Sequence, residues 1–399
     1  MRIAENTNLL KLSLVSFFLE LYFISPVVVL FFMQRGLTLF QVLLLEAAQV
    51  CVTLLLNVPL GIAADRYGRK MIIFSGSLIY TLAYYLMMIA YSFAGFLASF
   101  LIFGIGMAFL SSTMESLIYE DLKMKGVEGA MKRAMGHFGF FTILASVISP
   151  PVGSWIARDM TPETFNLLIL FSLISTVIAA VITLTVKEVP VMRGVHENPF
   201  RIMRYGLRLL RRDRSLLRIV LLNIFTNPFY VIIMYLFQPY FIASGNRVAS
   251  FGVIFSIAFS CAALSQRYAW KVEQVLGVRT AGFLMTFMPG AIYTAMALVS
   301  HRIASPVLFV LLWLFMGLRE PLFSQYINMH IQSGIRTAML SFISFLATLY
   351  LIAARIFIGS ITDRGHGLSF VIMGALIMGS SLIFRIRRAG PKRMTGLSY

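Results

Sequence analysis

The sequence predicts an all-α membrane protein with twelve transmembrane helices in two pseudo-symmetric six-helix bundles, and three observations lead to this prediction. Of the 399 residues, 59% are hydrophobic and only 13% are charged, with a mean hydropathy of +0.85. A soluble protein of this size could not keep so much apolar surface away from water. Segments long enough to cross about 30 Å of hydrocarbon recur along the chain. A long basic segment divides it nearly in half.

Each apolar segment has about 18 to 28 residues, the length that a membrane span requires. The first follows a short tail without a small-residue cleavage site, so we expect an uncleaved first helix. The predicted spans are 13–33, 41–64, 71–91, 94–118, 136–157, 165–186, 216–243, 249–266, 280–300, 305–329, 337–361 and 367–384.

The net charge of +18 reflects the topology of these spans. When both termini are placed on one side, that side receives most of the 34 Lys and Arg residues. The other side receives Arg35, Arg158, Arg247, Arg302 and Arg364. Because basic loops are retained in the cytoplasm, we expect a multi-pass protein of the cell membrane with both termini cytoplasmic.

The basic segment 188–215 is predicted to link an N-terminal bundle, 1–187, to a C-terminal bundle, 216–399. Within it, FRIMRYGLRLL alternates basic and apolar residues at helical spacing, which predicts an amphipathic helix on anionic lipid. A nucleic-acid-binding arm is the less favoured alternative. Similar stretches recur about 205 to 211 residues apart, as expected of duplicated halves. The counterpart of GIAADRYGRK falls near VEQVLGVRTAG.

The stretch GIAADRYGRK interrupts the apolar sequence between spans two and three with a dense polar cluster. It is similar to the loop motif G-x-x-x-D-R-x-G-R-K of the major facilitator superfamily, which carries it at the same place. The resemblance covers essentially the whole chain and implies the fold of that family and transport by alternating access. The matching residues are Gly61, Asp65, Arg66, Gly68, Arg69 and Lys70.

In that family the motif acts as a cytoplasmic latch between the halves. The resemblance therefore implies that Asp65 faces the N-terminal end of span eleven, near 336–340. It also implies that Arg69 reaches an acid at the inner end of span four, where the sequence offers Glu120 and Asp121. The alternative is that these charges only fix the topology, which would need neither the aspartate nor the glycines.

Two further features bear on coupling. The stretch SPPVGS in span five resembles the G-P-x-x-G-G motif of the antiporter branch, keeping Pro150 and Gly153 but replacing two glycines by serine. An ordinary packing seam of small residues explains it equally well. Span four lacks the arginine that many proton-coupled members carry. The coupling mechanism of those members is therefore not transferred to this chain.

Charged residues at bilayer depth are costly and indicate function. Glu20 in span one and Glu115 in span four are the predicted proton carriers, because a carboxyl group in an apolar cavity binds a proton more readily. Arg319 and Arg355 are expected to hold an anionic group of a solute or to pair with Glu320 or Glu46. Arg319 and Glu320 are adjacent and point about 100° apart on a helix, so we do not expect them to pair with each other.

Polar residues at helical spacing form stripes, among them Glu46, Gln49, Thr53 and Asn57 in span two and Ser111, Ser112, Glu115 and Tyr119 in span four. For the neutral members of these stripes we favour a role as interhelical hydrogen-bonding groups over one in binding a solute. The predicted cavity residues are Glu46, Gln49, Asn223, Asn227, Tyr230, Arg319, Glu320, Asn328 and Arg355.

These features favour a secondary transporter for a small, partly apolar solute, with proton-coupled efflux ahead of proton-coupled uptake of an organic anion. The sequence carries no nucleotide-binding loop, metal-spaced histidine pair or nucleophile elbow. We therefore expect no enzyme activity, cofactor or metal, and a monomer whose partners are a solute, protons and anionic lipid. A membrane-embedded transferase and a non-transporting receptor or scaffold are the alternatives from other classes.

Overall fold

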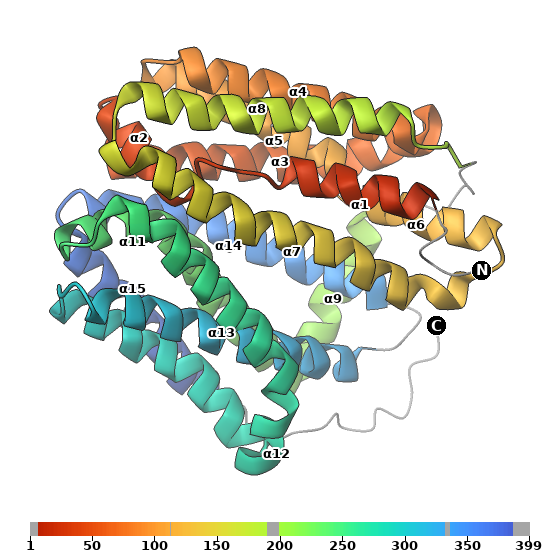
Figure 1. The fold of residues 1–399 in the computed structure, drawn as a ribbon. Coiled ribbons are helices and arrows are strands. Elements are labelled where there is room, and N and C mark those ends of the chain that lie inside the picture. The colour runs from red at the N-terminus through yellow and green to blue at the C-terminus, as the bar shows by residue number, and fades with distance from the viewer. Residues whose placement is uncertain (1–6, 112, 190–198, 332–335, 386–399) are drawn as a thin grey trace. The chain divides into compact units, whose positions relative to one another are not determined.

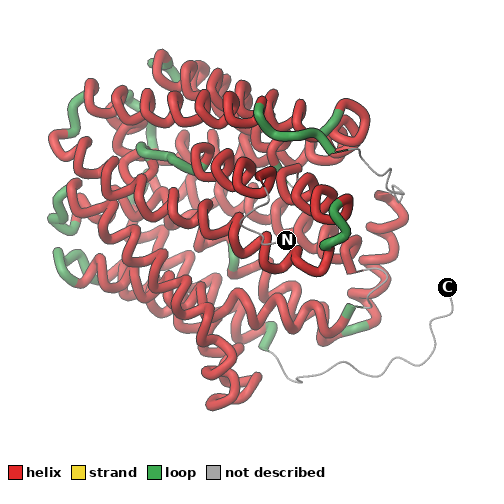
Figure 2. The backbone as a smooth tube through the Cα atoms, turned by 45° about the vertical axis from the view of Figure 1, so that its right-hand side comes forward, coloured by secondary structure: helices red, strands yellow, loops and turns green. Residues whose placement is uncertain are grey.

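The computed structural model describes residues 7–111, 113–189, 199–331 and 336–385, and these residues form helices joined by loops, without strands (Figures 1 and 2). The chain divides into two compact units. The first comprises 1–195 and 246–256, and the second comprises 196–245 and 257–399. The linker helix therefore belongs to the second unit.

The first unit is built from α1 to α8. Within it, α5 packs against α3 and α4, α4 packs against α8, and α1 packs against α7 and α8. Its helices are α1 (Thr7–Leu19), α2 (Val28–Gln34), α3 (Leu39–Tyr67), α4 (Arg69–Ile89), α5 (Phe93–Leu110), α6 (Thr113–Met124), α7 (Met131–Ile156) and α8 (Pro162–Leu184), with 3₁₀ turns η2 (Ser25–Val27), η3 (Glu128–Ala130), η4 (Ala157–Asp159) and η5 (Val248–Ser250).

The second unit holds the linker helix and the remaining spans. Within it, α10 packs against α13, α14 and α15, and α9 packs against α10 and α14. Its helices are α9 (Pro199–Arg212), α10 (Arg214–Thr226), α11 (Pro228–Ala243), α12 (Phe251–Leu298, whose first turns belong to the first unit), α13 (Ala304–His330), α14 (Arg336–Thr362) and α15 (His366–Ile383).

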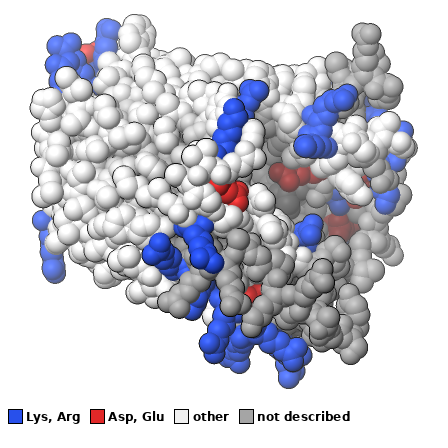
Figure 3. All heavy atoms as spheres, turned by 90° about the horizontal axis from the view of Figure 1, so that it is seen from below, with Lys and Arg blue, Asp and Glu red and all other residues white. Residues whose placement is uncertain are grey.

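The helices of the described chain are consistent with the predicted twelve spans. Ten helical stretches are long and apolar enough to cross a membrane, and one of them, 248–298, is bent at Gly277 and long enough for two. Two short apolar helices, Thr7–Leu19 and Ser25–Gln34, divide the predicted first span. Figure 3 shows a broad uncharged surface with few charged side chains, as a bilayer requires.

The first span is not the continuous helix that the sequence predicted. α1 ends at Leu19, and the chain is not helical again until Ser25. Pro26 explains the break, because its ring cannot follow a helical turn and it has no N–H to donate to residue 22. Glu20 therefore lies at the end of α1 and not within a helix.

The predicted span four is also divided. Ser111 ends α5 with an extended ψ of 130°, and α6 begins at Thr113. The predicted stripe of Ser111, Glu115 and Tyr119 was therefore wrong as a single helical face; its other member, residue 112, lies outside the described residues. Serine and threonine hydroxyls compete with helical hydrogen bonds, and here the Ser111 hydroxyl donates to Asn57 Oδ1 at 2.9 Å.

The predicted loop between spans eight and nine, 267–279, is helical instead. α12 runs through it, and Gly277 alone leaves helical geometry, with φ of +72° and ψ of 154°. Gly68 turns the chain from α3 into α4 with similar angles, φ of +89° and ψ of 142°. The two glycines occupy matching positions of the predicted internal repeat, and a positive φ favours glycine at both.

Candidate functional site

The motif GIAADRYGRK forms the corner between two helices of the first unit. α3 ends at Tyr67 and α4 begins at Arg69, so Gly68 alone joins them. The outer motif residues Gly61 and Arg66 are exposed, and Arg66 lies over the Tyr67 ring at 5.5 Å. The corner thus directs Arg69 inward while Arg66 faces out.

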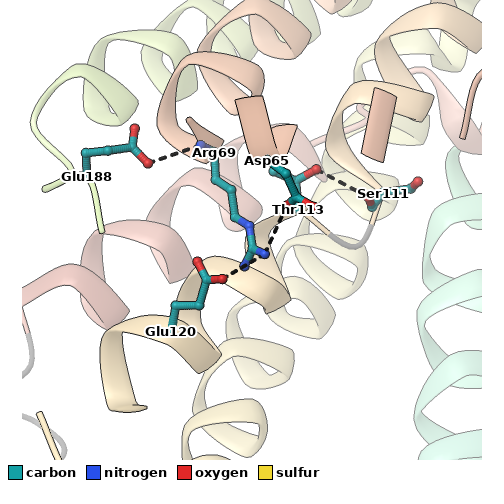
Figure 4. A network of polar contacts seen from close by, with 6 residues as sticks. All are labelled: Asp65, Arg69, Ser111, Thr113, Glu120 and Glu188. Carbon is teal, nitrogen blue, oxygen red and sulfur yellow. Dashed lines mark hydrogen bonds and ion pairs between the residues drawn. The ribbon is translucent and has the colours of Figure 1, made fainter. Parts of the chain in front are cut away.

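Arg69 lies at the centre of an ion-pair network (Figure 4). Its Nη2 is 2.8 Å from Glu120 Oε1 and 3.5 Å from Asp65 Oδ1. The Arg69 and Glu120 side chains are only 13% and 9% exposed, so water and salt screen their attraction weakly. The network joins α3, α4 and α6, and Glu120 is one of the two acids offered by the sequence for Arg69.

Glu188, which the sequence analysis missed, caps the start of α4. Its carboxylate accepts from the backbone N–H groups of Arg69 and Lys70, both at 3.1 Å. These N–H groups have no partner within the helix, and a negative charge is favourable at a helix N-terminus. A Cβ on Gly68 would lie 3.0 Å from the Glu188 carboxylate. The only sequence signal was an acid following the sixth span.

Replacing Glu188 by alanine is expected to lower the free energy of unfolding by about 1 kcal/mol, the usual cost of losing a helix cap. The apparent melting temperature in detergent should fall by about 2 to 4 °C for a unit of this size. The control is Glu163→Ala, which removes an exposed glutamate at the other end of α8. Equal falls in the two variants would contradict the capping role.

Asp121, the other acid that the sequence offered for Arg69, has its described partners elsewhere. It pairs with Lys125, which directly follows α6, and accepts from Asn8 Nδ2 at 3.0 Å. Asn8 also binds both backbone groups of Lys187, at 2.9 and 3.1 Å. No pattern in the sequence predicted that Asn8 joins α1 to α6 and to the segment after α8. Lys70, in turn, donates its ammonium to the Leu184 carbonyl at 2.7 Å.

The predicted contact of Asp65 with span eleven would join the two units, and it stays a prediction. Residues 332–335, just before α14, lie outside the described residues. Within the first unit, Asp65 lies beside Arg69, one turn along the chain. The motif therefore has a described role in joining helices of its own unit.

The acidic residues of the first two spans gather around tyrosines. Glu20 and Glu46 both lie close enough to Tyr80 to interact with its hydroxyl electrostatically. The Tyr84 ring lies 6.5 Å from the ring of Tyr80 and 6.0 Å from that of Tyr22. Three phenol rings thus pack in sequence, and both carboxylates interact electrostatically with the Tyr80 end of this row.

The other predicted residues of the first unit are either exposed or next to a hydrogen bond that joins two helices. Glu115 is exposed on α6. Gln49 is half-buried, and its backbone carbonyl accepts from Thr53, whose hydroxyl lies equally close to the Gly104 carbonyl at 2.9 Å. This part of the span-two stripe joins α3 to α5, as interhelical hydrogen bonds do.

Arg319 on α13 is fully buried in the second unit. Its Nη2 lies 2.6 Å from Asn223 Oδ1 and 2.9 Å from Thr226 Oγ1, and its Nη1 donates to Asn227 Oδ1 at 3.0 Å. These three residues form the last turn of α10 and its C-cap. A positive charge is favourable at a helix C-terminus, so Arg319 stabilises α10 where Pro228 starts α11.

Arg319 and Glu320 form no ion pair among the described residues, as the sequence predicted for neighbours on a helix. Arg319 forms no ion pair with any described carboxylate of its unit, and Glu320 is exposed. Adjacent residues of a helix point about 100° apart, which keeps the two side chains separate. The Arg319 guanidinium lies 4.5 Å from the Phe323 ring and 5.8 Å from the Tyr230 ring.

The remaining cavity residues of the second unit do not join this cluster in the described contacts. Arg355 on α14 is 3% exposed and lies 5.7 Å from the Tyr235 ring. Asn328 donates to the Ser324 carbonyl of its own helix at 2.8 Å. Of the residues predicted for the cavity, the structure therefore brings together Asn223, Asn227, Tyr230 and Arg319.

The stretch SPPVGS is a close-packed seam. A Cβ on Gly153 would lie 1.8 Å from the Phe23 carbonyl oxygen, in the break of the first span. The Phe23 N–H is bound by the Ser172 hydroxyl of α8 at 3.1 Å. Gly153 thus admits the non-helical backbone between α1 and η2, which supports the packing alternative. No group of three metal-binding side chains occurs among the described residues.

Comparison with known proteins places the chain in a family. A family model described as Major Facilitator Superfamily matches residues 11–336. The crystal structure of the nucleoside transporter NupG is similar with a TM-score of 0.77 at 13% identity, covering 95% of this chain and 98% of that chain. A comparison with curated protein sequences found no match.

Two further transporter structures show the same fold. A POT family transporter in complex with 5-aminolevulinic acid has a TM-score of 0.74 at 12% identity, covering 96% of each chain. A bacterial homologue of the human lysosomal transporter Spinster has a TM-score of 0.70 at 14% identity, covering 98% of this chain and 96% of that chain. Since the family model matches most of its length, this chain belongs to the major facilitator superfamily of transporters.

Proposed function

We propose that this protein exports a small organic solute by proton-coupled alternating access. The observation that carries the proposal is the position of Glu20 at the break in the first span, where both Glu20 and Glu46 interact electrostatically with Tyr80. A carboxyl group outside a regular helix can change its surroundings when the neighbouring helices move. Proton binding there removes a charge at bilayer depth, which eases a conformational change.

The test begins with a ligand, because binding to the folded state raises apparent stability. A thermal-shift screen of the purified protein covers metabolites and drugs. It includes nucleosides, because one structural relative is a nucleoside transporter, and 5-aminolevulinic acid, which is bound in the structure of another. The compound with the largest shift is then used as labelled solute in proteoliposomes. Accumulation against its gradient, on the side from which protons leave, supports proton-coupled export.

Replacing Glu20 by glutamine is expected to abolish accumulation driven by a pH gradient while solute exchange at equal pH continues. The reason is that glutamine is similar in size but cannot exchange a proton. Glu115→Gln tests the second predicted carrier in the same way, and Glu163→Gln is the control for an exposed glutamate. Full gradient-driven accumulation in both the Glu20 and Glu115 variants would show that neither carries the proton.

Uptake of an organic anion is the second candidate, and the observation that favours it is Arg319. This cation is buried and forms no ion pair with a described carboxylate of its unit. The two candidates differ in direction. Accumulation of an anionic solute on the side to which protons flow would support uptake over export.

The proposal also includes the cell membrane as location, a monomeric state and cytoplasmic termini. Its support is the concentration of Lys and Arg in the loops and tails on one side of the predicted spans. A fluorescent protein fused after Tyr399, of a kind that matures only in the cytoplasm, tests the orientation. A dark fusion at normal expression would contradict it.

A further inference from the structure

The linker helix α9 carries a continuous basic face. Arg204, Arg208 and Arg211 follow one another at i, i+4 and i+7, and Arg212 flanks them. This spacing places them on one side of a helix, and all four are exposed. Leu207, at the edge of this face, is 42% exposed.

The opposite face of α9 packs on the second unit. Leu209 and Leu210 are 6% and 5% exposed and belong to a hydrophobic core that includes Phe342 of α14. A Cβ on Gly206 would lie 2.5 Å from the Phe342 ring, so glycine allows α9 close to α14. The sequence predicted an amphipathic helix whose apolar face lies in lipid, and this is wrong for Leu209 and Leu210, because the protein itself covers them.

The connection to α10 holds α9 at the end of a membrane span. α9 ends at Arg212, and α10, the start of an apolar stretch that runs to Ala243, begins at Arg214. The intervening Asp213 accepts from the N–H groups of Ser215 and Leu216 at 2.9 and 3.1 Å, and its own N–H donates to the Leu209 carbonyl at 2.9 Å. In Figure 1, α9 runs across the direction of α14. The arginines therefore lie within a few residues of the bilayer boundary.

None of the four arginines has an ion pair or a hydrogen bond to another side chain in the described part of the chain. Four unpaired guanidinium groups repel one another, and anions are attracted to them. The anions nearest to such a position in a membrane are lipid phosphates. Arginine is well suited to bind them, since its planar N–H groups can contact two phosphate oxygens at once.

We propose that Arg204, Arg208, Arg211 and Arg212 form a binding surface for the headgroups of anionic phospholipids. Because Leu209 and Leu210 are buried in the protein, binding depends on charge and does not require insertion of the helix. The surface is attached to α14 through Gly206 and Phe342. A bound headgroup is therefore connected through α9 to α14, a membrane helix of the second unit.

The test uses the full-length purified protein in a neutral detergent. Its affinity for a short-chain phosphatidylglycerol is compared with that for the matching phosphatidylcholine and for inorganic phosphate. The variant is Arg204→Gln/Arg208→Gln/Arg211→Gln. The matched control, Arg247→Gln/Arg302→Gln/Arg364→Gln, removes the same charge from exposed loop positions elsewhere.

The α9 triple variant is expected to bind phosphatidylglycerol at least about tenfold more weakly, since each basic residue near an anionic headgroup contributes about fivefold. The control triple variant should bind within about twofold of the unaltered protein, and the affinity should fall as salt increases. An equal loss in both variants would overturn the proposal. Equal binding of phosphatidylcholine would also overturn it, as would binding of inorganic phosphate as tight as that of the lipid.

Discussion

Replacing Gly153 by alanine is expected to cause a large loss of stability in the first unit. The new Cβ would lie 1.8 Å from the Phe23 carbonyl oxygen and 2.9 Å from its carbonyl carbon. Both are backbone atoms, so no side-chain rotation can relieve the contact, and either α7 or the break in the first span must move. Overpacking of this kind costs about 3 kcal/mol.

The measurement is the apparent melting temperature in detergent, where we expect a fall of about 6 to 12 °C for a unit of this size. Gly139→Ala is the matched control, because it lies in the same helix and a Cβ there meets nothing within 4 Å. Alanine favours a helix over glycine by up to about 1 kcal/mol, so this control should be slightly more stable. A Gly153 variant as stable as the Gly139 variant would contradict the close approach.

Asn223→Leu is expected to destabilise the second unit by about 3 kcal/mol, because it leaves part of a buried charge without its acceptor. The Asn223 side chain accepts the shortest of the hydrogen bonds of Arg319, at 2.6 Å. Leucine has a similar volume, so the loss reports mainly on polarity. Thermal unfolding of the purified variant gives the measurement.

The double variant Asn223→Leu/Arg319→Leu should recover most of that stability. With the guanidinium gone, no buried charge needs an acceptor, and a well-packed apolar group can replace a buried polar network at little cost. Asn328→Leu is the control, because its amide donates to a carbonyl of its own helix and not to a charge. Additive losses in the double variant would show that Asn223 and Arg319 act independently.

The sequence predicted the parts of the structure that follow from the length of its apolar segments and from recognisable motifs. Apolar segments of spanning length identified the membrane helices, and the family motif identified the corner at Gly68. It also offered Glu120 as a partner for Arg69, and the two lie 2.8 Å apart. The spans and the corner follow from local composition and from a motif whose members are close in the chain, whereas the Glu120 partner followed from the family resemblance.

The contacts that the sequence did not reveal join residues far apart in the chain. Glu188 caps α4 from more than a hundred residues away, and Asn8 reaches Asp121 and Lys187. Polar residues of this kind give no periodic signal, because each serves one contact. The helix breaks near Glu20 and at Ser111 were missed because hydropathy continues across them, although Pro26 had marked the first.

The α9 helix shows a further limit of sequence patterns. An amphipathic pattern states that a helix has an apolar face, but not whether lipid or protein covers it. Here Leu209 and Leu210 are covered by the second unit. Gly206 carried the missing information, since a glycine in the middle of a helix is unfavourable unless close packing requires it.

The corners at Gly68 and Gly277 also show how matching positions of the predicted repeat differ. Both have a positive φ. The first is surrounded by the ion pairs of Arg69, whereas the described contacts around the second include a hydrogen bond from Tyr326 to Glu273 at 2.9 Å. The two corners therefore share their turn geometry but differ in their polar contacts. The corner at Gly68 carries an electrostatic network. The turn at Gly277 forms without that network, so its surrounding residues can serve a different role in the second unit.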